Sequence, residues 1–406
     1  MRNLLKMCVR SICRSFSRSY NLLPYFIFLI MLNSCISSYS EQVSLKPANF
    51  PAIPPVAGDS VQPGLAGPVT GSYGNFVLVA GGANFENGLP WRGGQKKYHD
   101  EIFLLENTGS GNFEWKQSAT KLPFPIAYPA CISTPEGVLS IGGEDQNGPV
   151  NQVFLFAFQN GNIKIENLPA LPQTISAAGT TIIGSDIFVA GGLTSQGATS
   201  AFYTINLQNK ASGWKVLPEL PLALSHAVVA AQNDGEEDCV YVIGGRNRTS
   251  EVTTFYSSVW KFKPSVQKWI SEGDILSEGK AHGLSAGTGI AVGSEHILLF
   301  GGDPGIYFNR TERLNNAIEK ASGEEEKQRL WKEKDEMLSS HPGFSKDILS
   351  FNTRSKKWEK IGNLTDESPA TTTAFMWNET VVIPSGEIRP GVRTPKVIGF
   401  EVTLEK

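Results

Sequence analysis

An apolar segment that ends in a pair of glycines recurs along this chain of 406 residues. The glycine pairs are Gly81-Gly82, Gly142-Gly143, Gly191-Gly192, Gly244-Gly245 and Gly301-Gly302. Their second glycines are 61, 49, 53 and 57 residues apart, so the chain is built from units of nearly constant length. Each unit is too short to bury a core alone, and therefore neighbouring units must stack against one another.

The segments that follow each glycine pair indicate blades of a propeller. A polar loop leads to a second apolar strand, at 102–104, 153–155, 202–204, 259–261 and 348–350. An outer strand follows, marked by Trp115, Trp214, Trp269 and Trp358 in four units and by residues 163–165 in the second unit. This period and strand pattern are typical of Kelch repeats. They predict an all-β fold, a six-bladed Kelch β-propeller.

We expect the strand before each glycine pair to line the propeller axis. The chain must turn sharply at the end of this strand, and glycine adopts the positive φ of such a turn without a steric penalty. The sixth unit carries Ser385-Gly386 in place of the pair and then has only the strand at 397–402 before the chain ends. This blade is therefore one strand short. We expect residues 43–47 to supply its outer strand and to close the ring, since closure removes exposed sheet edges.

The fifth unit contains a long insertion. Trp358 follows Gly302 by 56 positions, whereas in the other tryptophan-marked units the tryptophan follows the glycine pair by 22 to 33 positions. The inserted sequence is rich in Glu, Lys and Leu, which predicts a helical insertion in the fifth blade at about residues 305–343. It is either a solvated decoration or a lid over one propeller face. The lid is favoured because long insertions in compact domains are usually functional.

The N-terminal segment has the features of an export signal. Residues 1–34 hold five basic residues and no acidic one, and an apolar run at 26–32 is shorter than the roughly 20 residues of a membrane-spanning helix. The sequence Leu32-Asn33-Ser34-Cys35 resembles a lipobox, which favours a lipoprotein signal with Cys35 as the lipidated residue over a plain cleaved signal. We therefore expect a signal peptide at 1–34, a single propeller at 36–406, and a periplasmic or outer-membrane-anchored lipoprotein of a Gram-negative bacterium. Its only membrane contact would be the lipid anchor, and its oligomeric state stays open.

Charge and cysteine content exclude several classes of partner. Loss of the five basic residues in 1–34 changes the net charge from -3 to -8, which argues against nucleic acid as a partner. A site for an anion must then be a local cationic patch. Beyond Cys35 only Cys131 and Cys239 remain, both in strand-like segments, so we expect unpaired core cysteines and neither a disulfide framework nor a zinc site.

Residues 386–394, Gly-Glu-Ile-Arg-Pro-Gly-Val-Arg-Thr, closely resemble the motif Gly-Glu-x-Lys/Arg-Pro-Gly-x-Arg-Thr of bacterial N-acetylneuraminate epimerases, the Kelch sialic acid mutarotases. The segments 80–85, 96–102 and 141–144 and the helical insertion are similar to the same family, so the resemblance spans residues 43–404. The motif blade comes last here, whereas it precedes the blade of residues 80–85 in the better-known members. The chain therefore resembles the cyclically permuted branch of the family.

The resemblance implies that the chain interconverts the α and β anomers of N-acetylneuraminate, a small-molecule sugar acid, without a cofactor or a metal. Ring opening requires that the anomeric hydroxyl loses a proton and the ring oxygen gains one, and a carboxylate can move that proton. Glu387 lies where the family has its proposed acid/base. Arg393 matches the family's arginine, and a guanidinium holds a carboxylate by two parallel hydrogen bonds. These two residues are the expected catalytic pair.

Other residues are expected to bind substrate. Arg389 corresponds to the lysine of the family motif, although it also fits a surface charge. Glu144 follows a glycine pair, so the ring symmetry directs it to the same face as Glu387, and it fits equally well a structural carboxylate. The remaining candidates for polar contacts are Asn84, Arg92, Lys97 and Arg246, while His226 is expected to be structural.

Two other functional classes are compatible with a Kelch propeller. The chain lacks the Asp-box repeats of hydrolytic sialidases, and two cysteines in strand-like runs argue against a copper radical oxidase. A non-catalytic sugar- or protein-binding propeller stays possible because a fold does not define a function. The pair Glu387 and Arg393 within its motif favours the mutarotase.

Overall fold

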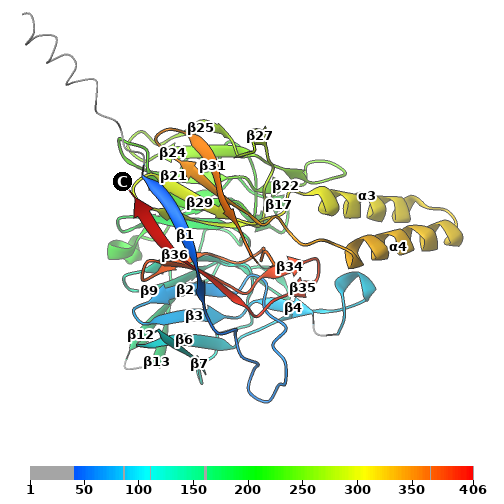
Figure 1. The fold of residues 1–406 in the computed structure, drawn as a ribbon, viewed down its shortest axis with the longest axis horizontal. Coiled ribbons are helices and arrows are strands. Elements are labelled where there is room, and N and C mark those ends of the chain that lie inside the picture. The colour runs from blue at the N-terminus through cyan, green and yellow to red at the C-terminus, as the bar shows by residue number, and fades with distance from the viewer. Residues whose placement is uncertain (1–40, 86, 110, 160–161, 366, 406) are drawn as a thin grey trace, which may run out of the picture. The chain divides into compact units, whose positions relative to one another are not determined.

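The computed structural model describes residues 41–405 except 86, 110, 160–161 and 366, and within it Val43–Glu405 form one compact unit. Its strands build six four-stranded sheets, the blades of a β-propeller (Figure 1). The expected signal peptide and Cys35 lie outside the described residues. No helix in the described part of the chain has the length and apolar character needed to cross a bilayer.

The strands of each blade follow one another from the inside outwards. Blade one contains β2 (Val69–Tyr73), β3 (Phe76–Ala80), β6 (Ile102–Gly109) and β7 (Asn112–Gln117); blade two β8 (Ala130–Thr134), β9 (Gly137–Ile141), β12 (Val153–Gln159) and β13 (Asn162–Leu168); blade three β14 (Gly179–Ile183), β15 (Asp186–Ala190), β18 (Phe202–Asn206) and β19 (Lys215–Val216). Blade four contains β20 (Val228–Asn233), β21 (Asp238–Ile243), β24 (Ser258–Lys263) and β25 (Lys268–Asp274); blade five β28 (Thr288–Val292), β29 (His296–Phe300), β30 (Asp347–Asn352) and β31 (Lys357–Asn363); blade six β32 (Phe375–Trp377), β33 (Thr380–Pro384), β36 (Val397–Glu405) and β1 (Gln42–Asn49).

Short hairpins and helices leave this framework. The hairpins are β4 (Ala83–Phe85) with β5 (Lys96–Tyr98), β10 (Glu144–Asp145) with β11 (Gly148–Pro149), β16 (Leu193–Thr194) with β17 (Gly197–Ala198), β22 (Arg246–Asn247) with β23 (Thr254–Phe255), β26 (Leu276–Ser277) with β27 (Lys280–Ala281), and β34 (Glu387–Arg389) with β35 (Val392–Arg393). The helices are η1 (Pro90–Arg92), η2 (Leu207–Ser212), α3 (Ile306–Lys320) and α4 (Glu324–Ser339). Helices α3 and α4 lie between β29 and β30, which confirms the helical insertion in the fifth blade.

The two ends of the propeller pair in one blade, as predicted. Strand β1 is hydrogen-bonded to β36 and forms the outer strand of blade six. Lys46 Nζ lies 3.0 Å from Glu401 Oε2 across this edge, and the ring of Phe50 packs so closely that a Cβ on Gly399 would lie 2.3 Å from it. Because β1 supplies the fourth strand of blade six, this blade is complete and the ring is closed.

The expectation that the glycine pairs end the axial strands is wrong. The strand before each pair is the second of its blade, and the first strand lines the axis. The conformation at the pairs is nevertheless as predicted, since the first glycines have φ of 61° to 67°, and a Cβ on Gly142 would lie 2.3 Å from the carbonyl oxygen of Ile175. Ser385 adopts the same conformation with φ 57°, and its Oγ accepts a hydrogen bond from Leu65 N at 2.8 Å.

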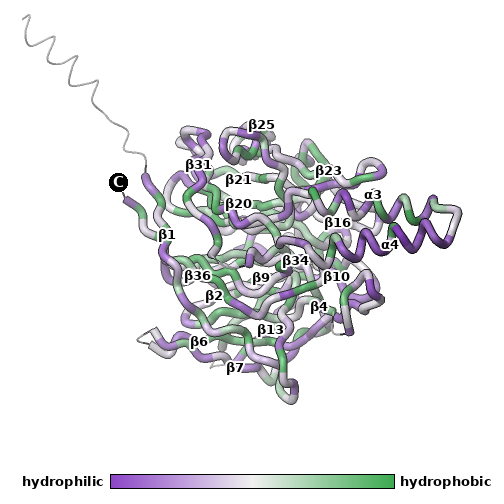
Figure 2. The backbone as a smooth tube through the Cα atoms, turned by 45° about the vertical axis from the view of Figure 1, so that its right-hand side comes forward, coloured by the Kyte–Doolittle hydropathy of each residue, from purple (hydrophilic) through white to green (hydrophobic). Residues whose placement is uncertain are grey.

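Apolar side chains pack between neighbouring blades, where Figure 2 shows strands of high hydropathy. Leu139 and Ile141 of blade two, for example, pack with Ile187 and Val189 of blade three. Tryptophans at the outer strands link neighbouring blades. Each indole N–H donates to a backbone carbonyl in the segment that follows the outer strand of the preceding blade. The pairs are Trp115 with Pro51 at 2.8 Å, Trp214 with Pro169 at 2.7 Å and Trp269 with Pro218 at 2.9 Å. Cys131 and Cys239 are buried and unpaired, as predicted.

A closed circle of backbone hydrogen bonds surrounds the axis at the start of the inner strands. One residue per blade donates its N–H to the carbonyl of its counterpart in the preceding blade, at 2.7 to 3.0 Å. These six residues, which we call the axial ring, are Gly67, Tyr128, Ala177, His226, Ala286 and Thr371. All have φ between 50° and 59°, although five of them are not glycine. The circle therefore holds side-chain-bearing residues in the left-handed region, at a cost of about 1–2 kcal/mol each.

We predict that Ala177→Gly increases the free energy of unfolding by about 0.5 kcal/mol. Glycine relieves the left-handed strain of about 1–2 kcal/mol, and the greater entropy of the unfolded chain offsets about 0.4–1 kcal/mol of it. Urea denaturation measures the change. The control is Ala190→Gly in β15, which is buried in an extended strand and should lose about 0.5–1 kcal/mol. Equal destabilisation by both substitutions would show that the axial ring stores no strain.

Candidate functional site

The residue after each glycine pair occupies an equivalent position in every blade. It forms a backbone bridge with the residue before the axial-ring residue of its blade, for example Glu387 with Ala370 and Glu144 with Ala127. The six equivalent residues are Ala83, Glu144, Leu193, Arg246, Asp303 and Glu387. Ring symmetry thus places two acids and an arginine from blades four to six, and Glu144 from blade two, on the same propeller face.

A cavity of about 550 Å³ lies between this face and the insertion. Its propeller side is formed by Arg246, Asp303 and Glu387 together with Ala286 and Thr371 of the axial ring. Its other walls come from α3, α4 and η1, through Tyr307, Phe308, Thr311, Asn315, Lys334, Leu338, Pro90 and Trp91. The helices therefore cover the cavity, and the insertion is a lid in this structure. The volume falls within the range of sites for small molecules, about 300–1,000 Å³.

Glu387 and Arg393 are directly opposite each other in the hairpin β34–β35. The turn between them contains Gly391, whose φ is 74° and whose N–H donates to Glu387 Oε1 at 2.8 Å. Arg393 Nη2 lies 3.6 Å from Glu387 Oε2, and its guanidinium stacks on the ring of Phe85 at 4.6 Å. Nε and Nη1 of Arg393 are buried and have no hydrogen-bond partner among the described residues. Glu387 lines the cavity, and Arg393 lies directly behind it.

Arg246 lines the cavity from blade four. Its guanidinium lies over the rings of Phe308, at 4.8 Å, and Phe255, at 5.9 Å, and Nη2 lies 3.3 Å from Nε2 of His226. Burial lowers the pKa of this guanidinium, whereas the nearby carboxylates of Asp303 and Glu387 act in the opposite direction. An arginine keeps its charge under such conditions. Arg246, one of the expected substrate contacts, therefore presents a cation to the cavity.

Asp303 was not identified from the sequence. It is 8% exposed, and its Oδ1 accepts a hydrogen bond from Gly305 N at 2.8 Å at the start of α3. Burial raises the pKa of this carboxyl. The signal was present, since Asp303 follows Gly301-Gly302 as Glu387 follows Ser385-Gly386. Asp303 and Glu387 thus line one cavity in different environments, together with Glu312 of α3.

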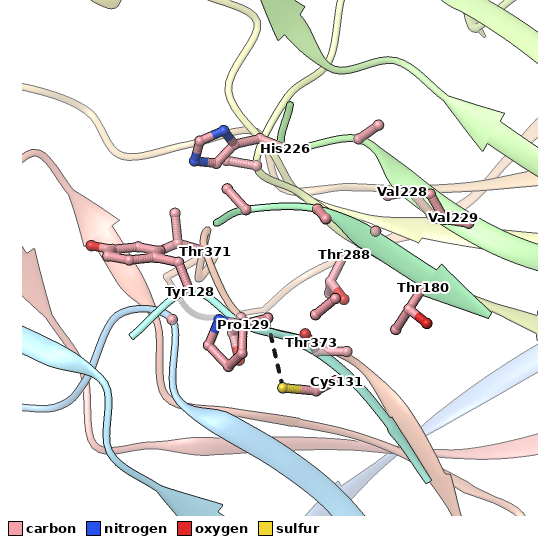
Figure 3. A pocket seen from close by; sticks show the side chains of 18 of the residues that line it. Tyr128, Pro129, Cys131, Thr180, His226, Val228, Val229, Thr288, Thr371 and Thr373 are labelled. Carbon is pink, nitrogen blue, oxygen red and sulfur yellow. Dashed lines mark hydrogen bonds between the residues drawn. The ribbon is translucent and has the colours of Figure 1, made fainter. Parts of the chain in front are cut away.

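The axial ring separates this cavity from the central channel. Ala286 and Thr371 line both spaces, and Figure 3 shows Tyr128, His226 and Thr371 around one end of the channel. Burial and the charge of Arg246 lower the pKa of His226, and burial raises the pKa of Tyr128. Both side chains are therefore neutral near pH 7. His226 lines the channel and contacts Arg246 from that side, but it does not line the cavity.

Glu144 is equivalent to Glu387 in the ring but does not line the cavity. Its Oε1 accepts hydrogen bonds from Lys96 Nζ at 2.6 Å and Tyr98 Oη at 2.8 Å, and its Oε2 accepts one from Ser176 Oγ at 3.2 Å. Both oxygens are occupied by protein donors. The structure thus favours the alternative of a structural carboxylate.

Four other expected contacts also lie away from this cavity. Asn84 and Lys97 line a separate space beside the segment 56–65, where Asn84 Oδ1 lies 2.9 Å from His99 Nε2. Arg92 binds Asp335 of α4 through two hydrogen bonds of 2.6 and 2.8 Å. Arg389 is exposed on the hairpin. Arg92 therefore ties the lid to blade one and does not face the cavity.

The fold and the site define a class: a lidded six-bladed propeller with acidic and basic side chains on one face. Residues 168–406, more than half of the chain, match the N-acetylneuraminate epimerase family. The chain therefore belongs to this family.

Individual relatives match parts of the chain. It is 27% identical over 249 residues to an N-acetylneuraminate epimerase of Haemophilus influenzae, covering 59% of this chain and 60% of that protein. It is 35% identical over 125 residues to one of Brucella melitensis, covering 28% of this chain and 31% of the relative. The chain thus matches between a third and three fifths of the length of these curated relatives. The solved structure of YjhT has a TM-score of 0.56 at 13% identity and covers 84% of this chain and 98% of that one, which shows the shared fold.

Proposed function

We propose that this protein is a sialic acid mutarotase, which interconverts the α and β anomers of N-acetylneuraminate by ring opening and closure. The observation that carries the proposal is the cavity in which the carboxylate of Glu387 is held beside two guanidinium groups, those of Arg393 and Arg246. The epimerase names of the relatives support the same reaction.

Glu387 is the proposed base. The hydrogen bond from Gly391 N fixes Oε1, so Oε2 is the oxygen left to take the proton from the anomeric hydroxyl. The bond between the anomeric carbon and the ring oxygen then breaks, and the ring oxygen takes up a proton as the open-chain ketone forms. Asp303, which lines the same cavity and whose pKa is raised by burial, is the proposed donor of that proton. Rotation of the ketone and the reverse transfers give the other anomer, and both carboxyls regain their initial states.

The substrate's own carboxylate requires a cationic partner. Arg246 lines the cavity, whereas Arg393 does not. A planar guanidinium holds a carboxylate at two points, so Arg246 is the proposed partner of the substrate carboxylate, and Arg393 positions Glu387.

We predict that Glu387→Gln slows mutarotation by about 10²–10⁴-fold with little change in melting temperature. The amide oxygen keeps the hydrogen bond from Gly391, while the basic oxygen is lost. Proton NMR of freshly released α-N-acetylneuraminate follows its conversion to the β anomer with parent and variant. A variant as fast as the parent would exclude Glu387 as the base. If the parent does not exceed the spontaneous rate, the mutarotase is refuted. The alternatives are then a non-catalytic propeller that binds a sugar or one that binds a protein.

Arg246→Lys should raise the apparent substrate constant more than it lowers turnover, because an ammonium cannot reproduce the two-point contact. The same NMR assay across substrate concentrations separates the two effects. Arg389→Lys is the matched control, since Arg389 is exposed and does not line the cavity. Equal kinetics for Arg246→Lys and the parent would remove this arginine from substrate binding.

We further propose that the protein is exported as a lipoprotein, from the basic and apolar N-terminal sequence and the lipobox-like segment that ends at Cys35. Mass spectrometry of the mature protein from a Gram-negative host should find an N-terminal lipidated Cys35. A mature chain that begins elsewhere would contradict this.

A further inference from the structure

The faces of the lid helices that line the cavity carry polar side chains beside Tyr307, Phe308 and Leu338. Thr311 and Asn315 lie one turn apart on α3, and Lys334 lies opposite them on α4. Apolar side chains between the helices, among them Leu314, Leu330 and Met337, form a separate small core. The polar residues are therefore not needed to pack the helices together.

Lys334 is a buried cation without a negative partner. It is 8% exposed, its Nζ donates to Asn315 Oδ1 at 2.7 Å, and it lies 4.4 Å from the centre of the Trp331 ring. Among the described residues no carboxylate forms an ion pair with it, and burial alone lowers the pKa of this ammonium. Only one of its three donors is used by the protein.

Another buried lysine of the same chain shows the contrast. Lys261 is 6% exposed, and its Nζ lies 2.9 Å from a carboxylate oxygen of both Asp234 and Glu272. A buried charge without such partners is costly, so Lys334 destabilises the free protein unless a ligand supplies acceptors.

The lid is fixed where Lys334 meets the cavity. Asp335, the next residue, accepts hydrogen bonds from Arg92 and from Trp91 Nε1, the latter at 2.8 Å. On α3, Glu312 accepts hydrogen bonds from Thr253 N and Oγ1 at 2.7 and 3.0 Å. Both helices are thus tied to the propeller, so the position of the ammonium relative to the floor is defined.

We propose that Lys334 and Asn315 form a subsite for the uncharged acyl amide of the sugar acid. The inference rests on the proposed function, in which Arg246 at the propeller face takes the carboxylate. The Lys334 ammonium and the Asn315 amide N–H groups are donors, since Asn315 Oδ1 already accepts from Lys334, whereas the Thr311 hydroxyl donates to Tyr307 O at 2.8 Å and leaves its oxygen as an acceptor. Donors beside one acceptor fit the carbonyl oxygen and the N–H of an amide.

Lys334→Met tests the subsite, because methionine keeps the apolar length and removes the charge. Calorimetry and the NMR exchange assay are run with N-acetylneuraminate and with 3-deoxy-octulosonate, a keto-sugar acid without the acyl amide. The variant should bind N-acetylneuraminate about tenfold to a hundredfold more weakly, bind 3-deoxy-octulosonate nearly as the parent does, and melt no lower than the parent. Lys332→Met, an exposed lysine of the same helix, should match the parent.

Unchanged binding of N-acetylneuraminate would overturn the subsite, as would an equal loss for both sugars or a lower melting temperature, which indicates a structural role. A parent that binds both sugars with the expected preference but does not interconvert anomers would refute the mutarotase and leave the subsite standing. A phosphorylated sugar acid could bind the parent more tightly than N-acetylneuraminate and lose this advantage in Lys334→Met. That result would show that the subsite holds a second anionic group, and it would overturn the assignment of an uncharged group to the subsite.

Discussion

The closed circle of six backbone hydrogen bonds around the axis is the constraint on which the rest of the structure depends. Each bond joins adjacent blades at the start of their inner strands, so the circle fixes where every blade begins relative to its neighbours. The left-handed conformation of its members turns the chain from the preceding loop into the inner strand. Because the residue before each member bridges to the residue after the glycine pair, the same circle also fixes the backbone of the site.

Function on such a framework comes from different side chains at equivalent backbone positions. Blades four, five and six present Arg246, Asp303 and Glu387 to the cavity. The equivalent positions of blades one and three hold the apolar residues Ala83 and Leu193, which do not line it. The lid lies over the polar positions and is tied to blade one through Arg92. The cavity is therefore off the axis, although the ring that supports it is nearly symmetric.

The sequence predicted the blades, their number and the joining of the two ends because these follow from a repeated local pattern. It failed to place the inner strands, since segments such as residues 179–183 and 288–292 are short, small and without the glycine pair that marks their neighbours. It left Glu144 open between a substrate contact and a structural carboxylate, because equivalence in the ring does not show which donors surround a carboxylate. Asp303 was missed although its place after Gly301-Gly302 gave the signal, and Lys334 was missed because the cavity that it lines is built from segments far apart in the chain. The permuted blade order stays a prediction.

The pairing of β1 with β36 means that the first and last strands of the described chain meet within a sheet and not at a boundary between blades. The break in the covalent backbone is bridged by the same hydrogen bonds that hold every other outer strand. Consequently, an opening at another outer strand would leave the axial circle and the cavity intact. The distance of a residue from the N-terminus then carries no functional meaning in this architecture. Propellers whose chains begin in different blades should therefore be aligned by the position of each residue relative to the nearest glycine pair.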